Sequence, residues 1–488
     1  MILKKFPTTV LLALTLCCSS CMGDLDIMQD NKLSASNMWT EEKDATSAAY
    51  GLYYYLRSAF SDRIIYWGEY RNGLWGAGTH GTLINNEMAA VATNTMSATN
   101  TYADWSGLYT TINQANLILK YVPEMSLSDE NKDFAMGNAY YVRAICYFWI
   151  ARIWGDAPLC LDGYESTAQD MYLPRSPKSE LYKQVETDIV NAAGYVKSSM
   201  VDKTTVTPAA LAMLKTDYAL WMYTNQNAGE GYLTMAEDAI SSMSLTESEL
   251  QSDYAAIFSS RSKLGKEVIW AIHKDQSEAV NGFSLYQMWG SNYVASQYVN
   301  NPVPVTSGNQ WWLYTERYIR LITEDPSDIR ADVSYGHGAY GTGGAEVGWA
   351  NKFVGQVISN TRVLDSDLIL YRYAQAYLFD AEIKYYRKQY VQALHSLGVV
   401  TNRAYGNAGY YQDATPEAVL DAIVKENLKE FTSEYNTWWM LIRTNKCWDY
   451  NENLARLKDK QNILLWPITQ GALNRNHNLK QTEGWIGQ

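Results

Sequence analysis

Long amphipathic segments, arranged in consecutive pairs, constrain the fold of this chain more than any other feature of its sequence. The apolar residues of segment 102–122 are Trp105, Leu108, Ile112, Ala115 and Leu119. Their spacing of three or four residues places them on one face of a helix, and Pro123 directly afterwards is a common stop signal. Segment 133–154 repeats this pattern and ends at the turn that begins with Gly155. We therefore expect a helical hairpin whose two apolar faces pack together.

Further segments with helical periodicity follow the same paired arrangement. They are 39–60, 179–197, 207–224, 367–387 and 390–405. Thr207 and Pro208 are typical of a helix N-cap and first helical position. Ala381, Tyr390 and Ala393 show the small and aromatic spacing of tetratricopeptide-type hairpins. The sequence predicts a mainly α, single continuous domain with a tetratricopeptide-like scaffold at about 39–60, 102–242 and 367–405.

Two long regions, about 61–101 and about 274–360, lack this periodicity and are rich in Gly, Asn, Tyr and Trp. Loops longer than about 12 to 15 residues in a compact domain are usually functional or disordered. Their aromatic content argues against disorder. We expect irregular, loop-rich regions with short strands that carry a binding function, followed by a C-terminal segment, 406–488.

The aromatic composition favours a solvent-exposed binding surface. The chain has 38 Tyr and 17 Trp but only 9 Phe, so most of its rings have a polar edge. Its net charge of -12 repels phosphate backbones. We therefore do not expect a nucleic-acid partner.

The first 20 residues resemble a secretory signal peptide, with Lys4 and Lys5 before an apolar stretch. Ser19 and Ser20 precede Cys21, as small residues do in a bacterial lipobox, where cleavage makes the cysteine the acylated N-terminus. We expect lipidation at Cys21 and a tether over 21–38. The alternative is an ordinary secretory signal with a cysteine there by chance.

Motifs for catalysis or metal binding are weak. The five histidines are isolated, and no pair has the spacing of ligands on one helix face. Asp62, Glu69 and Glu87 fall in the first loop-rich region, but a glycosidase pair is defined by spatial separation, which sequence does not give. We expect no metal, no cofactor and no catalytic residue. Glycoside hydrolysis remains the weaker alternative.

Residues 140–159, Tyr-Tyr-Val-Arg-Ala-Ile-Cys-Tyr-Phe-Trp-Ile-Ala-Arg-Ile-Trp-Gly-Asp-Ala-Pro-Leu, resemble the signature of the SusD/RagB family of Bacteroidetes surface lipoproteins. Other segments resemble that family in the same order, over nearly the whole chain. They are 105–123, 206–223, 370–382, 402–406 and 465–485. The chain departs from the family pattern at Glu426-Asn427 and Glu434-Tyr435, which we interpret as a different ion-pair network in a buried structural helix.

The resemblance implies a non-catalytic lipoprotein of the outer membrane, exposed at the cell surface. It would form a lid on a SusC-like TonB-dependent transporter and capture oligosaccharide or polysaccharide for import. Some relatives resemble peptide-import partners instead, so peptide binding is the main alternative. Asp24 and Asp26 after Cys21 are similar to the family's surface-export signal. The membrane partner would be lipid, through acylated Cys21.

A sugar ring packs its C–H face on an indole or phenol, and its hydroxyls bind amide, carboxylate or guanidinium groups. Candidates of these kinds in the two loop-rich regions are Trp67, Arg71, Asn72, Trp75, Asn85, Asn86, Trp289, Asn292, Tyr293, Tyr298, Trp311 and Trp312. From these we predict a glycan site of Trp75, Trp289, Tyr293, Trp311, Arg71, Asn85, Asn292 and Tyr298. Glycines beside Trp75 and Trp289 suggest that both rings are exposed, so their replacement by Ala should weaken binding with little change in stability.

Overall fold

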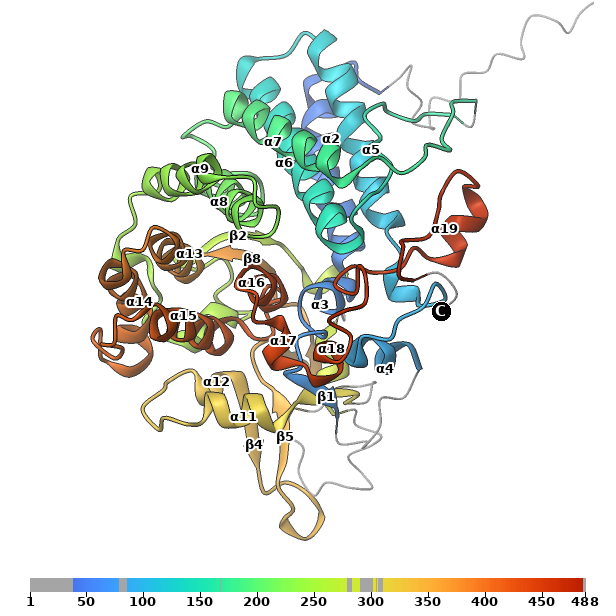
Figure 1. The fold of residues 1–488 in the computed structure, drawn as a ribbon. Coiled ribbons are helices and arrows are strands. Elements are labelled where there is room, and N and C mark those ends of the chain that lie inside the picture. Colours follow the sequence, from blue (N-terminus) through green and yellow to red (C-terminus); the bar gives the residue numbers. More distant parts are fainter. Residues whose placement is uncertain are drawn as a thin grey trace, which may run out of the picture.

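The computed structural model describes residues 38–78, 86–166, 168–278, 283–289, 302–303, 305 and 310–485. Most of these residues are helical, and the strands among them are short and paired in twos (Figure 1). The prediction of a mainly α fold with a helical-hairpin scaffold and short strands is confirmed.

The scaffold consists of antiparallel helices that pack on their neighbours in sequence. Its helices are α2 (Glu42–Phe60), α5 (Ser106–Tyr121), α6 (Asp129–Trp154), α7 (Lys178–Tyr195), α8 (Pro208–Thr224), α9 (Glu230–Ser242), α13 (Tyr373–Tyr386), α14 (Tyr390–Tyr405) and α15 (Pro416–Phe431). Helix α6 packs against α2, α5 and α7, while α13 packs against α9, α14 and α15. Figure 1 shows α5, α6 and α7 as one group of helices and α13, α14 and α15 as another.

Helix boundaries follow local capping chemistry. The Thr207 hydroxyl accepts a hydrogen bond from the Ala210 backbone N–H at 3.1 Å, as expected for an N-cap. Helix α6 begins one turn earlier than predicted because the Ser128 hydroxyl accepts from the Asn131 N–H at 3.4 Å. Polar residues in this first turn hid the start from the apolar periodicity.

One predicted helix starts too early. Residues 367–372 were included in helix 367–387, but Leu368–Arg372 form strand β8, which pairs antiparallel with β2 (Val268–Ile272). Both strands are buried along most of their length. A short, continuous apolar run fits a buried strand or a buried helical turn equally well, so periodicity could not separate them.

The irregular regions contain more short helices than the sequence pattern predicted. The remaining elements that matter below are α3 (Arg63–Gly68), β1 (Trp75–Ala77), α4 (Asn86–Thr93), β3 (Trp312–Tyr314), α11 (Glu316–Ile322), α12 (Ala331–Ser334), β4 (Tyr335–Gly338), β5 (Val347–Ala350), β6 (Gln356–Ile358), β7 (Thr361–Val363), α16 (Thr437–Arg443), α17 (Cys447–Tyr450), α18 (Glu452–Ala455) and α19 (Gln470–Arg475). Strand β4 pairs with β5, and β6 pairs with β7.

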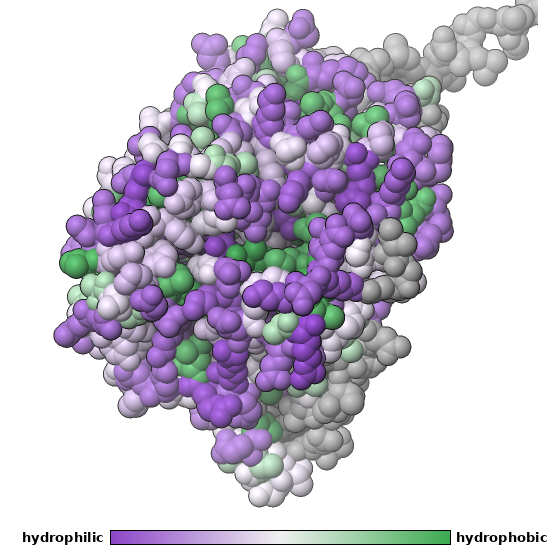
Figure 2. Space-filling view, in the orientation of Figure 1, coloured by the Kyte–Doolittle hydropathy of each residue, from purple (hydrophilic) through white to green (hydrophobic). Residues whose placement is uncertain are grey.

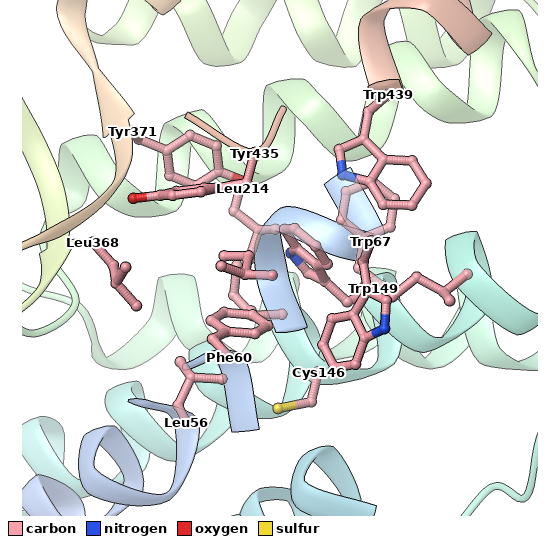
Figure 3. Packing of buried hydrophobic residues seen from close by; sticks show 14 of the residues in the cluster. Leu56, Phe60, Trp67, Cys146, Trp149, Leu214, Leu368, Tyr371, Tyr435 and Trp439 are labelled. Atoms are coloured by element: carbon pink, nitrogen blue, oxygen red, sulfur yellow. The ribbon is translucent and has the colours of Figure 1, made fainter. Parts of the chain in front are cut away.

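One large hydrophobic core joins the scaffold to the irregular regions and the C-terminal segment (Figure 3). The Trp149 ring of α6 lies 5.0 Å from Phe60 of α2 and 5.6 Å from Trp439 of α16, between ring centroids. Trp67 of α3 contacts the same cluster at 6.4 Å from Trp149. The irregular regions are therefore held on the scaffold by shared aromatic packing.

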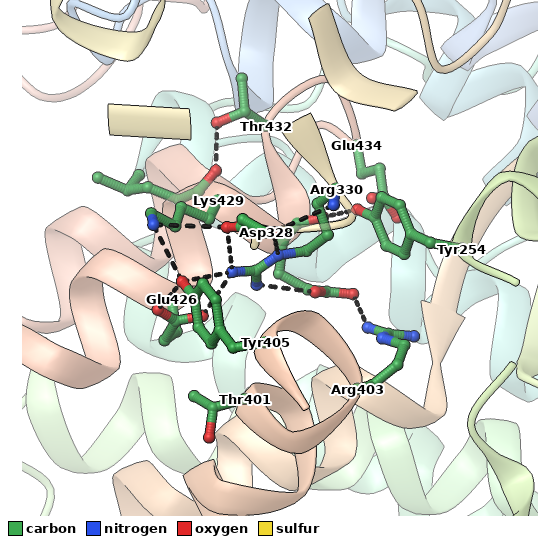
Figure 4. Close-up of polar contacts among 12 residues, drawn as sticks. Tyr254, Asp328, Arg330, Thr401, Arg403, Tyr405, Glu426, Lys429, Thr432 and Glu434 are labelled. Carbon is green, nitrogen blue, oxygen red and sulfur yellow. Dashed lines mark hydrogen bonds and ion pairs between the residues drawn. The ribbon is translucent and has the colours of Figure 1, made fainter. Parts of the chain in front are cut away.

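A buried ion-pair network also connects distant segments, as we expected from the sequence around Glu426 and Glu434. Arg330 contacts Asp328 at 2.8 Å, Glu426 at 2.8 Å and Glu430 at 3.1 Å (Figure 4). All four side chains are fully buried. The network fixes α15 against the second irregular region.

Among the described residues, no helix is long and apolar enough to cross a membrane. The described cysteines, Cys146, Cys160 and Cys447, are free thiols.

Candidate functional site

The two loop-rich regions meet in a two-stranded sheet. Strand β1 of the first region pairs antiparallel with β3 of the second, with Trp75 opposite Tyr314 and Ala77 opposite Trp312. The Gly78 N–H extends the contact by donating to the Trp311 carbonyl at 2.8 Å. A side chain at Gly78 would place its Cβ 2.1 Å from the Gln310 carbonyl oxygen, so this close approach requires glycine. The two regions therefore form one structural unit.

A stacked pair of half-buried rings lies beside this sheet. The centroids of Tyr286 and Trp311 are 4.8 Å apart, with 7° between the ring planes. The Trp311 backbone N–H donates to the Tyr286 carbonyl at 2.8 Å, which fixes the two residues together. We call β1, β3, Tyr286 and Trp311 the strand junction. Burial, with a smaller contribution from Asp62, raises the pKa of Tyr286, so its hydroxyl is protonated at neutral pH.

The two strands also contribute to a buried aromatic layer. Trp312 stacks on Tyr70 at 3.9 Å, and the Trp75 ring lies 5.1 Å from Tyr70 and 4.4 Å from Tyr314. Trp75 is only 3% exposed. Because a ring that stacks on a sugar must present one face to solvent, the structure gives Trp75 a packing position and not the exposed one suggested by its sequence.

Arg71 lies in the interior as well. Its guanidinium donates to Asn94 Oδ1 at 2.7 Å and to the carbonyls of Leu464 and Ile463 at 2.7 and 2.6 Å. Burial lowers the pKa of Arg71 to about 9. Each of its three nitrogens makes one of these hydrogen bonds, two of which attach the C-terminal segment to the first irregular region, and the side chain is fully buried and so not accessible to a ligand in this arrangement.

Trp289 is 1% exposed and belongs to a separate small hydrophobic cluster. Its neighbours there include Met288, Val305 and Trp349. Like Trp75, it lies in the interior. The other predicted ligand residues, Asn85, Asn292, Tyr293 and Tyr298, lie outside the described residues.

Two of the three carboxylates considered for glycoside hydrolysis have structural partners. Glu69 is fully buried and accepts from Asn72 Nδ2 at 3.2 Å and from the Ser433 N–H at 3.3 Å. Burial raises the pKa of Glu69 to about 7. Glu87 accepts from the backbone and hydroxyl of Thr101 at 3.1 and 2.7 Å. Across the described part of the chain, no group of three or more His, Cys, Asp or Glu is placed to hold a metal ion.

A second feature, not identified from the sequence, is a groove on the scaffold of about 780 Å³. Its walls come from α5, from segment 158–172 and from residues 472–479. Aromatic side chains of Trp105, Tyr109, Tyr164 and Tyr172 line it. We call it the α5–α19 groove. The face of the molecule in Figure 2 is mostly hydrophilic, with small separate groups of hydrophobic residues.

Comparisons with known proteins agree over most of the chain. Residues 70–216 match a family model described as "Starch-binding associating with outer membrane", and residues 331–485 match the model of the SusD family. SusD-like protein P38 of Formosa agariphila is 25% identical over 509 aligned residues, which cover 98% of each chain.

Solved structures show the same fold. A SusD superfamily protein of Bacteroides fragilis aligns with a TM-score of 0.78 at 25% identity, over 92% of this chain and 100% of that one. NanU of B. fragilis aligns with a TM-score of 0.79 at 25% identity, over 94% and 100% of the two chains. The family matches over residues 70–216 and 331–485 and the fold shared over 92% and 94% of the chain show that the chain belongs to the SusD/RagB family.

Proposed function

We propose that this chain is a non-catalytic, surface-exposed lipoprotein that binds an oligosaccharide or polysaccharide at the strand junction and delivers it to a SusC-like TonB-dependent transporter. Family membership supports the general role, because SusD-family proteins are outer-membrane-associated binding proteins of nutrient uptake. The observation that carries the choice of site is the half-buried Tyr286–Trp311 pair, which lies where the two aromatic-rich regions join.

The chemistry of this pair suits a saccharide. Each ring has a flat apolar surface for sugar C–H groups, and the pair is held rigid by stacking and by a backbone hydrogen bond. A rigid aromatic anchor contributes contact area at little cost in conformational entropy. Trp311 therefore remains a proposed ligand residue, and Asn85, Asn292, Tyr293 and Tyr298 are proposed to complete the site.

Affinity electrophoresis tests the class of ligand. The purified chain is run in native gels that contain individual polysaccharides, and calorimetry is performed with oligosaccharides and oligopeptides. We expect retardation by at least one polysaccharide and no reducing sugar released. Heat with oligopeptides only would support the peptide-binding alternative, and release of reducing sugar at turnover rates would support a glycoside hydrolase.

Replacing Trp311 by Ala is expected to weaken saccharide binding by about ten- to hundredfold, the range typical of one stacked aromatic. Trp448 of α17 is half-buried like Trp311 but contacts Asn445 and Lys458, which do not belong to the junction, so Trp448→Ala is the matched control. Calorimetric titration gives both affinities. Equal affinities of the two variants would exclude Trp311 as a ligand residue.

Lipidation can be tested at Cys21, which lies outside the described residues. Cys21→Ala should leave the protein unlipidated and free of the membrane fraction, because acylation needs the thiol. Cys160→Ala is the control, since this half-buried cysteine of the mature chain should leave membrane association unchanged. If Cys21→Ala stays in the membrane fraction until detergent is added, another anchor is present.

A further inference from the structure

The α5–α19 groove has the size and rigidity of a ligand site. Its volume of about 780 Å³ lies within the range of about 300 to 1,000 Å³ that is usual for small-molecule sites. Figure 1 shows α19 on the same side of the molecule as α5. The groove is on the scaffold and shares no lining residue with the strand junction.

Hydrogen bonds hold the walls of the groove in place. The Asn113 side chain accepts from the Tyr164 backbone N–H at 2.6 Å and donates to its carbonyl at 3.0 Å. The Tyr109 hydroxyl donates to the Pro158 carbonyl at 2.8 Å. On the other side, Asn476 Nδ2 donates to the Leu173 carbonyl at 2.8 Å. Asn478 Nδ2 likewise donates to the Tyr172 carbonyl at 2.6 Å, so wall residues are fixed to α5 on one side and to the C-terminal residues on the other, and a ligand would find a preformed groove.

The lining combines aromatic faces with unusual exposure of apolar groups. Tyr172 is 48% exposed and Met171 is 44% exposed, although both are large hydrophobic side chains. Tyr109 and Tyr164, which are half-buried, provide further ring surface, whereas Trp105 is only 6% exposed. Most lining amides are already used to hold the walls, so ring faces are the principal contacts that remain. Such faces pack against the C–H groups of sugar rings.

A single charged residue, Arg475, lines the groove. Its side chain is exposed, and it makes no hydrogen bond or ion pair with any described residue. No carboxylate lines the groove, although the chain as a whole carries a net charge of -12. By contrast, a groove of about 710 Å³ between α2 and α6 is lined by Glu130, Asp133 and Asp202 against Lys197 alone.

Charged residues of both signs contact or lie near the residues that line the groove. Arg175 donates only to the backbone carbonyls of Asp156, Lys480 and Trp154, and its positive charge acts on the pKa of Tyr109. Asp104 accepts from Ser106 of the lining. Asp162 and Asp170 act on the pKa of Tyr164. These acids lie outside the lining itself, so the charge that a ligand in the groove meets first is that of Arg475.

We propose that the α5–α19 groove is a second saccharide-binding site, which takes an acidic oligosaccharide by pairing a sugar carboxylate with Arg475 and packing sugar rings on Tyr172 and its aromatic neighbours. The guanidinium is suited to this role because its planar fork binds a carboxylate through two parallel hydrogen bonds. This site goes beyond the proposed function, because it lies apart from the strand junction and selects ligands by charge.

Calorimetry with tetragalacturonate, tetraguluronate and the neutral cellotetraose tests this proposal on the purified chain. We expect at least one acidic tetrasaccharide to bind and cellotetraose to bind at least tenfold more weakly. Arg475→Gln should reduce acidic binding by about tenfold and remove its dependence on NaCl concentration, since salt screens the ion pair. Tyr172→Ala should weaken binding as well. Both side chains are exposed, so the melting temperatures should stay at the wild-type value.

Two controls separate this site from the strand junction. Arg456→Gln removes another exposed arginine, which lies 3.8 Å from Glu452, and it should leave acidic binding unchanged. Trp311→Ala should also leave it unchanged. The groove proposal is overturned if neither acidic tetrasaccharide binds, if cellotetraose binds equally well, or if Arg475→Gln has no effect. Loss of acidic binding in Trp311→Ala alone would place the acidic ligand at the junction.

Discussion

Replacing Arg372 by Met is expected to lower the free energy of unfolding by about 3 to 5 kcal/mol, the usual cost of removing one partner from a buried ion pair. Arg372 is 1% exposed and contacts Glu267 at 2.8 Å, Glu430 at 2.6 Å and Glu434 at 2.7 Å. These carboxylates come from β2's N-terminal flank, α15 and the turn after it. Methionine occupies a similar volume but carries no charge, so the three buried carboxylates would lose one of their positively charged partners.

The pKa of Glu430 shows how strongly the network depends on its arginines. Burial alone would raise this pKa, but Arg403, Arg372 and Arg330 outweigh burial and hold it well below its usual range. A carboxylate with a lowered folded-state pKa stabilises the fold above its unfolded pKa of about 4.5, and the stabilisation is lost as the pH falls through the folded value.

Urea unfolding at neutral pH measures the effect, with Arg387→Met as the matched control. Arg387 forms ion pairs with Glu230 and Glu237 at 3.1 and 3.0 Å, but these carboxylates are 70% and 45% exposed. Its loss should therefore cost about 1 kcal/mol or less. Equal unfolding free energies for the two variants would contradict the structural role of the buried network.

Replacing Trp75 by Ala is expected to cost about 3 to 5 kcal/mol of stability, as for other large-to-small changes in a packed core. The ring is 3% exposed and packs between Tyr70 and Tyr314 in the interior of the strand junction. Its indole N–H also lies 3.4 Å from Glu69 Oε1. The substitution would leave a cavity in this layer and disturb saccharide binding only indirectly.

Tyr54→Ala is the control for this change, because Tyr54 is 61% exposed on α2. It should alter the unfolding free energy by less than about 0.5 kcal/mol. If Trp75→Ala instead kept wild-type stability and lost saccharide binding, the ring would be a ligand contact, as its sequence context suggested.

The sequence allowed the scaffold to be predicted because helical periodicity and capping are local properties. Segment 390–405 matches α14 at both ends, and Thr207 caps α8 as expected. Strand β8 was assigned to a helix, because a buried strand of five residues has no periodicity that distinguishes it from helix.

The positions of the candidate ligand residues depended on contacts that are remote in sequence. Glycine beside Trp75 suggested exposure, yet a Cβ at Gly73 would lie 2.2 Å from the Tyr450 carbonyl oxygen, so this glycine permits close packing. Arg71 binds the carbonyl of Leu464, 393 positions later. Neither contact can be recognised from the residues that are adjacent in the sequence.

Two features of the sites could not be identified from local sequence for the same reason. Tyr286 becomes a candidate only because it stacks on Trp311. The α5–α19 groove exists only because α5, segment 158–172 and the C-terminal residues converge. Trp105 has the periodicity of a packing residue, and its position in the groove depends on that convergence.

The central claim, saccharide binding at the junction of the two irregular regions, is tested most directly by a crystal structure of the chain with an oligosaccharide of the polysaccharide that retards it in native gels. We expect a sugar ring packed on the Tyr286–Trp311 pair beside β1 and β3. A saccharide bound only elsewhere, with the junction rings making no contact to it, would exclude the strand junction as the binding site.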